Sequence, residues 1–348
     1  MIGILGIQSS MGRQVVRLLT QWGFSPVRGG SRRMPPADLP SCVSWQTVDI
    51  ADPDSLQRFV AGCELIINCA GPSHITTPRV LSAALRASVH LIDAGGASCK
   101  NLNMPQWRKN IVLLDAGAVP GLSGWLPRWL AQDFSRVDSL QVWQGILDRF
   151  TPSGAEDFLA GVPIGRYQRS ADLLTQQNLP FFPRPVQVMP WQDNETQWVS
   201  NSLGVGNSRW FSVSDGQALP AVMRELAFMT SSQACTALVN ASAQDVQSFR
   251  PYVRYLLEVT GKQAGGNQTE SALIQGEGVA QVCGTFIATL AVGVITSPDS
   301  FCRHNFHAAQ VPLLPQLIRH LFSPDSGVRY QRFPVSVAQL METEGGSL

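Results

Sequence analysis

The feature that most constrains this chain is a strand, a tight turn and a helix within its first 23 residues. Apolar residues from Ile2 to Ile7 predict a short strand. The helix that follows carries its apolar side chains at the spacing of one buried face, at Val15, Leu18, Leu19 and Trp22. Gly23 then stands where a helix C-cap takes a left-handed residue. A strand that opens directly into a helix N-terminus predicts an anion site, because free backbone N–H groups and the positive end of the helix dipole meet there.

The turn between this strand and this helix resembles a dinucleotide-binding motif with one departure. Gly6 permits a tight turn and Gly12 permits close packing of the helix, while Ser9 stands where the motif has its middle glycine. The residues predicted to surround a pyrophosphate are Gly6, Gln8, Ser9, Ser10, Met11 and Gly12. The alternative is a strand-to-helix turn that binds no ligand.

The end of the second strand predicts which dinucleotide would bind. Enzymes that use NAD have an acidic residue here that accepts a hydrogen bond from the ribose 2′-hydroxyl. This chain has no carboxylate in residues 28–33. Arg32 and Arg33 suit a 2′-phosphate, because guanidinium groups match phosphate oxygens, and Ser31 beside them is a further predicted cofactor contact. The sequence therefore predicts NADPH/NADP+ as cofactor, with a solvated basic loop as the alternative. Asp49, which follows the third strand, is a candidate contact at the adenine end or an ordinary loop residue.

Three further strands follow, at residues 65–70, 89–92 and 111–114, and helices alternate with them. This alternation predicts a doubly wound parallel α/β sheet of the Rossmann type. The strand at residues 65–70 delivers Gly71 to His74 to the carboxyl edge of the sheet, where ligands bind in such folds. Thr77 and Pro78 are predicted to start the next helix.

Beyond Phe134 the pattern changes. Strands are predicted from Leu140 and at residues 186–189, 197–200, 209–213 and 253–259, with a helix over residues 218–229. This pattern predicts an α+β substrate domain with a largely antiparallel sheet, inserted into the first domain. The apolar helix at residues 279–294 is expected to return to the first domain. The expected division is residues 1–133, 134–277 and 278–348, the last being C-terminal helices.

Composition narrows the function classes. A net charge of +1 with 15% charged residues gives no field for a polyanion, so no nucleic-acid partner is expected. The chain opens on a core strand instead of a signal region, and its seven cysteines are never spaced C-x-x-C, which together favour a cytoplasmic protein. The apolar run at residues 279–295 is interrupted by polar residues, so no membrane span is expected. Cys302, His304 and His307 fit no standard ligand spacing, so no metal site is predicted.

Four segments together resemble the saccharopine dehydrogenase-like NADP-binding reductases. These are the glycine turn at residues 6–12, Asn68 to Pro72, Asp93 to Gly96, and Asp115 to Leu122. The resemblance covers about the first 130 residues and returns near residues 276–294. It implies a homodimer and contacts near the nicotinamide from two loops, whose residues are Asn68, Cys69, Ala70, Gly71, Pro72, Gly117, Pro120 and Gly121.

Within that family, the chain length and the aromatic middle are most similar to the thiazolinyl imine reductases of siderophore assembly, of the enantio-pyochelin kind. This resemblance implies reduction of a thiazoline to a thiazolidine by NADPH. It also implies that the substrate is a thioester on the carrier protein of a nonribosomal peptide synthetase.

Reduction of a C=N bond needs a proton donor within about 3 Å of the nitrogen. His74 is the first candidate, because it follows the Gly71–Pro72 turn at the sheet edge and imidazole titrates near neutrality. Glu156 and Asp157 are alternatives if burial raises their pKa. Tyr167 is a weaker candidate, and a water molecule is a further possibility.

Two other functions stay open at the level of sequence. An opine- or saccharopine-type dehydrogenase acting on a free amino acid would need cations for substrate carboxylates, and Arg149, Arg166, Arg169 and Arg184 are available. A non-catalytic NADP(H)-binding regulator would bind the coenzyme without oxidising it.

Overall fold

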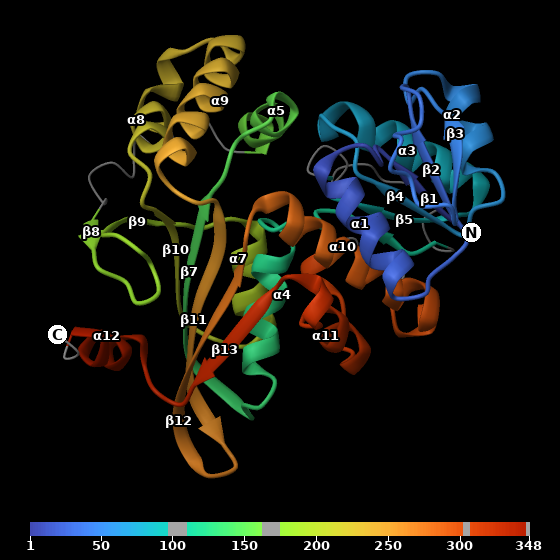
Figure 1. The fold of residues 1–348 in the computed structure, drawn as a ribbon. Helices are drawn as coiled ribbons and strands as arrows, with labels where there is room; N and C mark the ends of the chain where they lie inside the picture. Colours follow the sequence, from blue (N-terminus) through green and yellow to red (C-terminus); the bar gives the residue numbers. More distant parts are fainter. Residues whose placement is uncertain (97–109, 162–174, 302–306, 346–348) are drawn as a thin grey trace. The chain divides into compact units, whose positions relative to one another are not determined.

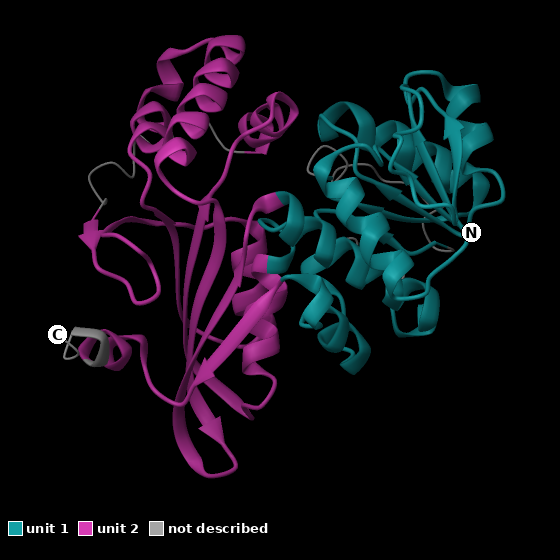
Figure 2. Ribbon diagram, viewed as in Figure 1, with its two compact units in different colours: residues 1–122, 280–327 teal, residues 123–279, 328–348 magenta. Residues whose placement is uncertain are grey.

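The computed structural model describes residues 1–96, 110–161, 175–301 and 307–345. It divides into two compact units (Figure 2): unit 1 comprises Met1–Leu122 with Ala280–Gly327, and unit 2 comprises Ser123–Val279 with Val328–Leu348. The first boundary therefore follows residue 122, where residue 133 was expected. Of the expected third segment, residues 280–327 group with unit 1, and residues 328–348 group with unit 2.

Unit 1 is a six-stranded parallel sheet with connecting helices (Figure 1). Its elements are β1 (Ile2–Leu5), α1 (Ser10–Gln21), β2 (Val27–Ser31), β3 (Val43–Thr47), α2 (Pro53–Val60), β4 (Leu65–Asn68), α3 (Ser73–Ala87), β5 (His90–Asp93), β6 (Val112–Leu113), α10 (Val279–Thr296), η5 (Pro298–Ser300), η6 (Ala308–Gln310), α11 (Pro315–Leu321) and η7 (Pro324–Ser326). The strand order β3-β2-β1-β4-β5-β6 confirms the predicted doubly wound sheet.

Local signals in the sequence explain the ends of these elements. Asp52 caps α2 by accepting a hydrogen bond from the backbone N–H of Asp54, and Pro53 occupies the first turn. Gly23 adopts the left-handed conformation, with φ +81°, just after α1. Every residue of β1 and β4 is buried, because both faces of the central strands are covered.

One helix of unit 1 begins earlier than predicted. Thr77 and Pro78 were expected to start it, but α3 begins at Ser73 and holds Pro78 within its second turn. The hydroxyl of Thr76 donates to the carbonyl oxygens of Ala70 (2.8 Å) and Pro72 (3.2 Å), so the first turn forms upstream of the proline. The proline therefore did not mark the start of this helix.

Helix α10 packs against α1 within unit 1. A Cβ atom built on Gly284 would lie 2.7 Å from Cβ of Gln14 and 2.9 Å from the carbonyl oxygen of Met11. The amide of Gln14 donates to the Thr285 hydroxyl (3.0 Å) and to the Ser326 carbonyl oxygen (3.3 Å). The small residue Gly284 thus allows the two helices to approach closely.

By length and composition α10 could cross a membrane, with a mean hydropathy of 1.9, but 72% of that window is buried inside the structure. A mostly buried core helix passes the same test, so this is weak evidence for a membrane span.

Unit 2 is a seven-stranded mixed sheet with helices (Figure 1). Its elements are α4 (Leu122–Ala131), β7 (Arg136–Leu147), α5 (Pro152–Gly161), β8 (Thr175–Gln177), β9 (Val186–Pro190), α7 (Asn194–Ser202), β10 (Asn207–Ser214), α8 (Ala218–Glu225), η4 (Leu226–Phe228), α9 (Ser231–Ser248), β11 (Tyr252–Gln263), β12 (Gly266–Gly276), β13 (Arg329–Phe333) and α12 (Val337–Gly345). The order is β13-β12-β11-β7-β10-β9-β8, and only β7 and β10 pair in parallel. The predicted, largely antiparallel sheet is confirmed.

The predicted strand at residues 197–200 is wrong, because these residues lie within helix α7. Asp193 and Thr196 form a capping box: the Asp193 carboxylate accepts from the Thr196 N–H (2.9 Å), and the Thr196 hydroxyl accepts from the Asp193 N–H (2.9 Å). This cap starts a helix immediately before the apolar pair Trp198 and Val199, which lies in the run that had been predicted as a strand. Helix α8 is likewise shorter than predicted and continues as the 3-10 turn η4.

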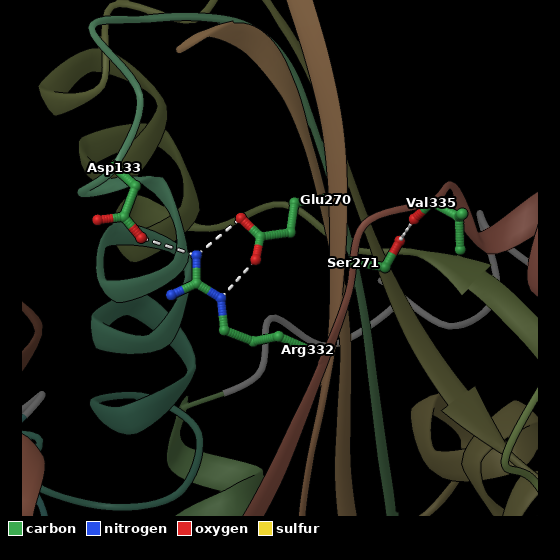
Figure 3. Close-up of polar contacts among 5 residues, drawn as sticks. All are labelled: Asp133, Glu270, Ser271, Arg332 and Val335. Carbon is green, nitrogen blue, oxygen red and sulfur yellow. Dashed lines mark hydrogen bonds and ion pairs between the residues drawn. The ribbon is translucent and has the colours of Figure 1, made fainter. Parts of the chain in front are cut away.

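The C-terminal segment joins unit 2 through β13, which pairs with β12. Figure 3 shows how Arg332 of β13 reaches Glu270 through two hydrogen bonds (2.5 and 2.7 Å) and Asp133 through one (2.8 Å). The hydroxyl of Ser271 donates to the carbonyl oxygen of Val335 (2.7 Å), just beyond the strand. Backbone pairing and a bidentate ion pair thus place this segment on the sheet, where helices alone had been expected.

Replacing Gly284 with valine should destabilise unit 1, because the new side chain meets Gln14 and the Met11 carbonyl oxygen. Overpacking of this kind costs about 1–3 kcal/mol in the free energy of unfolding. Urea denaturation followed by circular dichroism would measure it. Gly206→Ala is the control, because a Cβ at Gly206 meets nothing within 4 Å. Equal stability of the parent and Gly284→Val would contradict the packing of α10 on α1.

Candidate functional site

The N-terminus of α1 presents unused hydrogen-bond donors. Ser9 is its N-cap residue, and the Ser9 hydroxyl accepts from the N–H of Gly12 (3.0 Å). The N–H groups of Ser10 and Met11 donate to no acceptor in the described part of the chain. Two free N–H groups at the positive end of a helix dipole suit an anion. The serine that departs from the glycine motif thus has a role of its own, because it caps the helix.

The glycine turn and the loop after β4 meet at the carboxyl edge of the sheet. Gly6 has φ +70°, and a Cβ there would lie 2.7 Å from the backbone nitrogen of Ala70. The Ser9 hydroxyl also donates to the carbonyl oxygen of Cys69 (3.3 Å). Since β1 lies between β2 and β4, this is the point where the strand order reverses and ligands bind in such sheets. The structure therefore brings the predicted residues 6–12 and 68–72 together.

The end of β2 is tied to the same turn. The Ser31 hydroxyl donates to the side-chain oxygen of Gln8 (3.2 Å) and accepts from the N–H of Arg33 (3.1 Å). The Gln8 amide donates to the carbonyl oxygen of Met34 (2.5 Å). The guanidinium groups of Arg32 and Arg33 are exposed and have no hydrogen bond or ion pair to the residues that the model describes. Two available cations therefore lie in the loop predicted to receive a 2′-phosphate.

Asp49 and Arg28 have local structural roles. The Asp49 carboxylate accepts from the N–H of Ala51 (2.9 Å), which shapes the approach to α2. The Arg28 guanidinium donates to the carbonyl oxygens of Phe59 (2.7 Å) and Ala61 (2.9 Å) at the end of that helix. Asp49 stays a candidate contact for the adenine end, and its ordinary loop role is the one that the hydrogen bonds show.

Asn68 takes part in a buried hydrogen-bond network with Asp93. Its amide donates to the Asp93 carboxylate (2.7 Å), and its side-chain oxygen accepts from the N–H of Ala70 (3.1 Å). Burial raises the pKa of Asp93 to about 7, although the bonds from Asn68 and from the Gly95 N–H favour the charged form. Asn68 stays a predicted nicotinamide contact, and these bonds show that it also positions the loop after β4. Asp93 itself was identified only as part of a motif.

The loop at residues 115–121 is shaped by glycine and by a contact from α10. Gly121 has φ +120°, and a Cβ there would clash with the carbonyl oxygen of Asp115. The N–H of Leu122 donates to the carbonyl oxygen of Gly117 (3.0 Å), and the N–H of Ala118 donates to the sulfur of Cys283 (3.1 Å). Gly117 and Gly121 thus set the shape of the predicted nicotinamide loop, which also contains Pro120.

His307, which the sequence analysis considered only in rejecting a metal site, also lies against this loop. Nε2 of His307 lies 3.3 Å from the Asp115 carboxylate, and Nδ1 accepts from the N–H of Ala309 (3.1 Å). Because Nδ1 is an acceptor, the proton of the neutral ring is on Nε2, which lies beside the Asp115 carboxylate. The backbone bridge between Leu114 and His307 holds the pair at the end of β6. The two residues are far apart in the sequence, so no local spacing signals their contact.

The three proton-donor candidates lie on two helices. His74 is the second residue of α3 and is exposed, just after Gly71 and Pro72. Glu156, exposed, and Asp157, half-buried, lie on α5 of unit 2. Tyr167 and two of the candidate arginines, Arg166 and Arg169, fall outside the described residues, as do Cys302 and His304. Among the residues that the model describes, no group of three His, Cys, Asp or Glu side chains could hold a metal ion.

The raised pKa of Asp93 predicts a pH-dependent stability. The folded protein holds this proton up to about pH 7, whereas an unfolded chain releases it near pH 4. The contribution of Asp93 to the free energy of unfolding is therefore fully present below about pH 4 and is lost as the pH rises from there through 7. Relative to Asp93→Asn, the parent should lose about 1.4 kcal/mol per pH unit between pH 5 and 6.5, in denaturation measured at each pH.

The exposed Asp325→Asn, in the same unit, is the control and should parallel the parent at every pH. A constant difference between the parent and Asp93→Asn from pH 5 to 8 would show that Asp93 ionises normally.

Comparison with known proteins agrees with this architecture. No family model matches the chain. A probable mitochondrial saccharopine dehydrogenase-like oxidoreductase of Arabidopsis thaliana is 39% identical over 61 residues, which are 18% of this chain and 13% of that protein. The match thus spans about an eighth of the relative's length. The solved structure of apo, histidine-tagged saccharopine dehydrogenase (L-Glu forming) from Saccharomyces cerevisiae is similar over 96% of this chain and 99% of its own, with a TM-score of 0.67 and 12% identity. The chain therefore has the saccharopine dehydrogenase-like fold.

Proposed function

We propose that this protein is an NADPH-dependent oxidoreductase that reduces a C=N bond. The observation that carries the proposal is the free N-terminus of α1 at the point where the strand order reverses, with Arg32 and Arg33 available in the loop after β2. The saccharopine dehydrogenase-like fold supports a dehydrogenase or reductase, because the similar structure and the Arabidopsis relative are both named as such.

The residues present fit a dinucleotide. A Cβ at Gly12 would lie 2.5 Å from the Gly6 carbonyl oxygen, so α1 starts close against the turn. The N–H groups of Ser10 and Met11 would hold the pyrophosphate, and Arg32 and Arg33 the 2′-phosphate. NADPH rather than NADH is favoured, because the first acid after β2 is Asp38, seven residues beyond the strand, and its carboxylate is paired with Arg13.

When bound, the coenzyme supplies a hydride, and the protein has to orient the substrate and deliver a proton to its nitrogen. His74 is the first candidate donor, because it is exposed and follows the loop that meets the glycine turn. Glu156 and Asp157 are the alternatives.

The finer proposal is that the substrate is a thiazoline bound to the carrier protein of a nonribosomal peptide synthetase in siderophore biosynthesis. Its support is the resemblance in sequence. The aromatic side chains of unit 2 give this proposal little support. Trp143 and Trp210 are buried, and Trp143 stacks on Phe211 with 5.6 Å between the ring centroids.

A free amino-acid imine is the second candidate substrate, which the saccharopine dehydrogenase-like fold supports. It needs cations for carboxylates, but Arg184 is already paired with the fully buried carboxylate of Asp215 (2.7 Å) and lies over the ring of Phe249 (3.3 Å). Of the two described candidates, Arg149 is therefore the more accessible.

NADPH should bind more tightly than NADH, by about tenfold or more, because each charge-assisted contact to the 2′-phosphate stabilises only the phosphorylated coenzyme. The combined substitution of Arg32→Ala and Arg33→Ala should erase the difference, as measured by isothermal titration calorimetry. Arg58→Ala, an exposed arginine of α2, is the control. Equal affinities of the parent for the two coenzymes would refute the phosphate site.

The reaction is tested by NADPH oxidation with thioester-linked thiazolines, free thiazolines, and keto acids with amino acids. Rapid turnover of the thioester alone is expected. With saturating NADPH, His74→Ala should slow that turnover by about 100-fold and leave coenzyme affinity unchanged, because only proton delivery is lost. Efficient turnover of free thiazolines would count against the carrier protein, and efficient turnover of amino acids would favour the second candidate. Coenzyme binding without any oxidation would indicate a regulator.

A further inference from the structure

Arg13 lies on α1 beside the proposed coenzyme site and was not among the predicted contacts. It is the fourth residue of the helix, and helical side chains lean toward the helix N-terminus. Its Nη1 lies 2.7 Å from the Asp38 carboxylate, and both side chains are exposed, by 53% and 68%. The guanidinium group of Arg13 is therefore accessible at the end of α1 that presents the free N–H groups.

The loop that carries Asp38 is the same loop that carries Arg32 and Arg33. It is fastened to the glycine turn near its start, where Gln8 contacts Ser31 and Met34. Asp38 is the only acid between β2 and β3. Among the residues that the structure describes, the three arginines at positions 13, 32 and 33 have one carboxylate partner, Asp38, and a phosphate dianion would balance the two remaining charges.

We propose that the Asp38 carboxylate pairs with Arg13 only in the free protein. When the coenzyme binds, Arg13 leaves Asp38 and pairs with the 2′-phosphate instead. This inference rests on the proposed function and adds a residue that determines coenzyme specificity. The exchange is favourable because an exposed ion pair shifts an equilibrium by no more than about fivefold. A guanidinium group also binds phosphate through short, charge-assisted, often bidentate hydrogen bonds.

Two nucleotides isolate the 2′-phosphate from the rest of the coenzyme. Adenosine 2′,5′-bisphosphate and adenosine 5′-monophosphate differ only in that group, and neither contains nicotinamide. Their dissociation constants would be measured by calorimetry for the full chain, Arg13→Gln, Asp38→Asn and Arg17→Gln. Arg17 is the matched control, because it is an exposed arginine one turn further along α1 that contacts Gln14, Gln21 and the Asp325 carbonyl oxygen.

Arg13→Gln should weaken binding of the bisphosphate by about tenfold and change binding of the monophosphate by less than about twofold. Asp38→Asn should strengthen binding of the bisphosphate alone, by up to about fivefold, because the competing carboxylate is gone. Arg17→Gln should leave the dissociation constants of both nucleotides unchanged. Since all three side chains are exposed, each variant is expected to fold.

Tight binding of the bisphosphate that Arg13→Gln leaves unchanged would overturn the exchange and leave the proposed function standing. An equal loss of affinity for both nucleotides in Arg13→Gln would also overturn the exchange, because Arg13 would then contact the adenosine 5′-monophosphate part that the two nucleotides share. If the parent binds neither nucleotide, both the exchange and the coenzyme site are refuted.

Discussion

The close approach of backbone to backbone at the start of α1 is the constraint on which the candidate site depends. Gly6 takes a left-handed conformation that leaves no room for a side chain beside the loop after β4, and Gly12 lets the helix begin directly against the turn. The N–H groups of Ser10 and Met11, at the positive end of the helix dipole, have no acceptor within the described ranges of the chain. The charged side chains of the next loop can select among ligands only because this backbone arrangement first creates a place for an anion.

Segments far apart in the sequence support this turn and its neighbours. Gln14 of α1 meets Gly284 and Thr285 of α10, and the Ala118 N–H of the loop after β6 donates to Cys283 on the same helix. One buried helix thus contacts both the glycine-turn helix and the second loop of the proposed site. In unit 2 the corresponding support comes from β13, whose Arg332 reaches Glu270 and Asp133.

Local patterns in the sequence predict the parallel sheet, its strand ends and the glycine turn, because periodicity, caps and glycines act over a few residues. The same local rules failed at residues 197–200, where the capping box at Asp193 starts a helix, and at Pro78, which lies inside a helix. The Asp93–Asn68 network and the Asp115–His307 contact join residues 25 and 192 positions apart, so no short pattern shows them. Exposed charges such as Arg13 and Asp38 carry no periodic signal, and only the fold reveals their pairing.

Hydrogen–deuterium exchange with and without NADP+ tests the central claim most directly, because it reports on backbone N–H groups. The N–H groups of Ser10 and Met11 have no acceptor among the described residues, so they should exchange quickly in the free protein. Saturating NADP+ should slow exchange in the peptides that cover residues 6–12 and 68–72. Unchanged exchange across both segments, in a protein that binds the coenzyme, would place the coenzyme elsewhere and contradict the account.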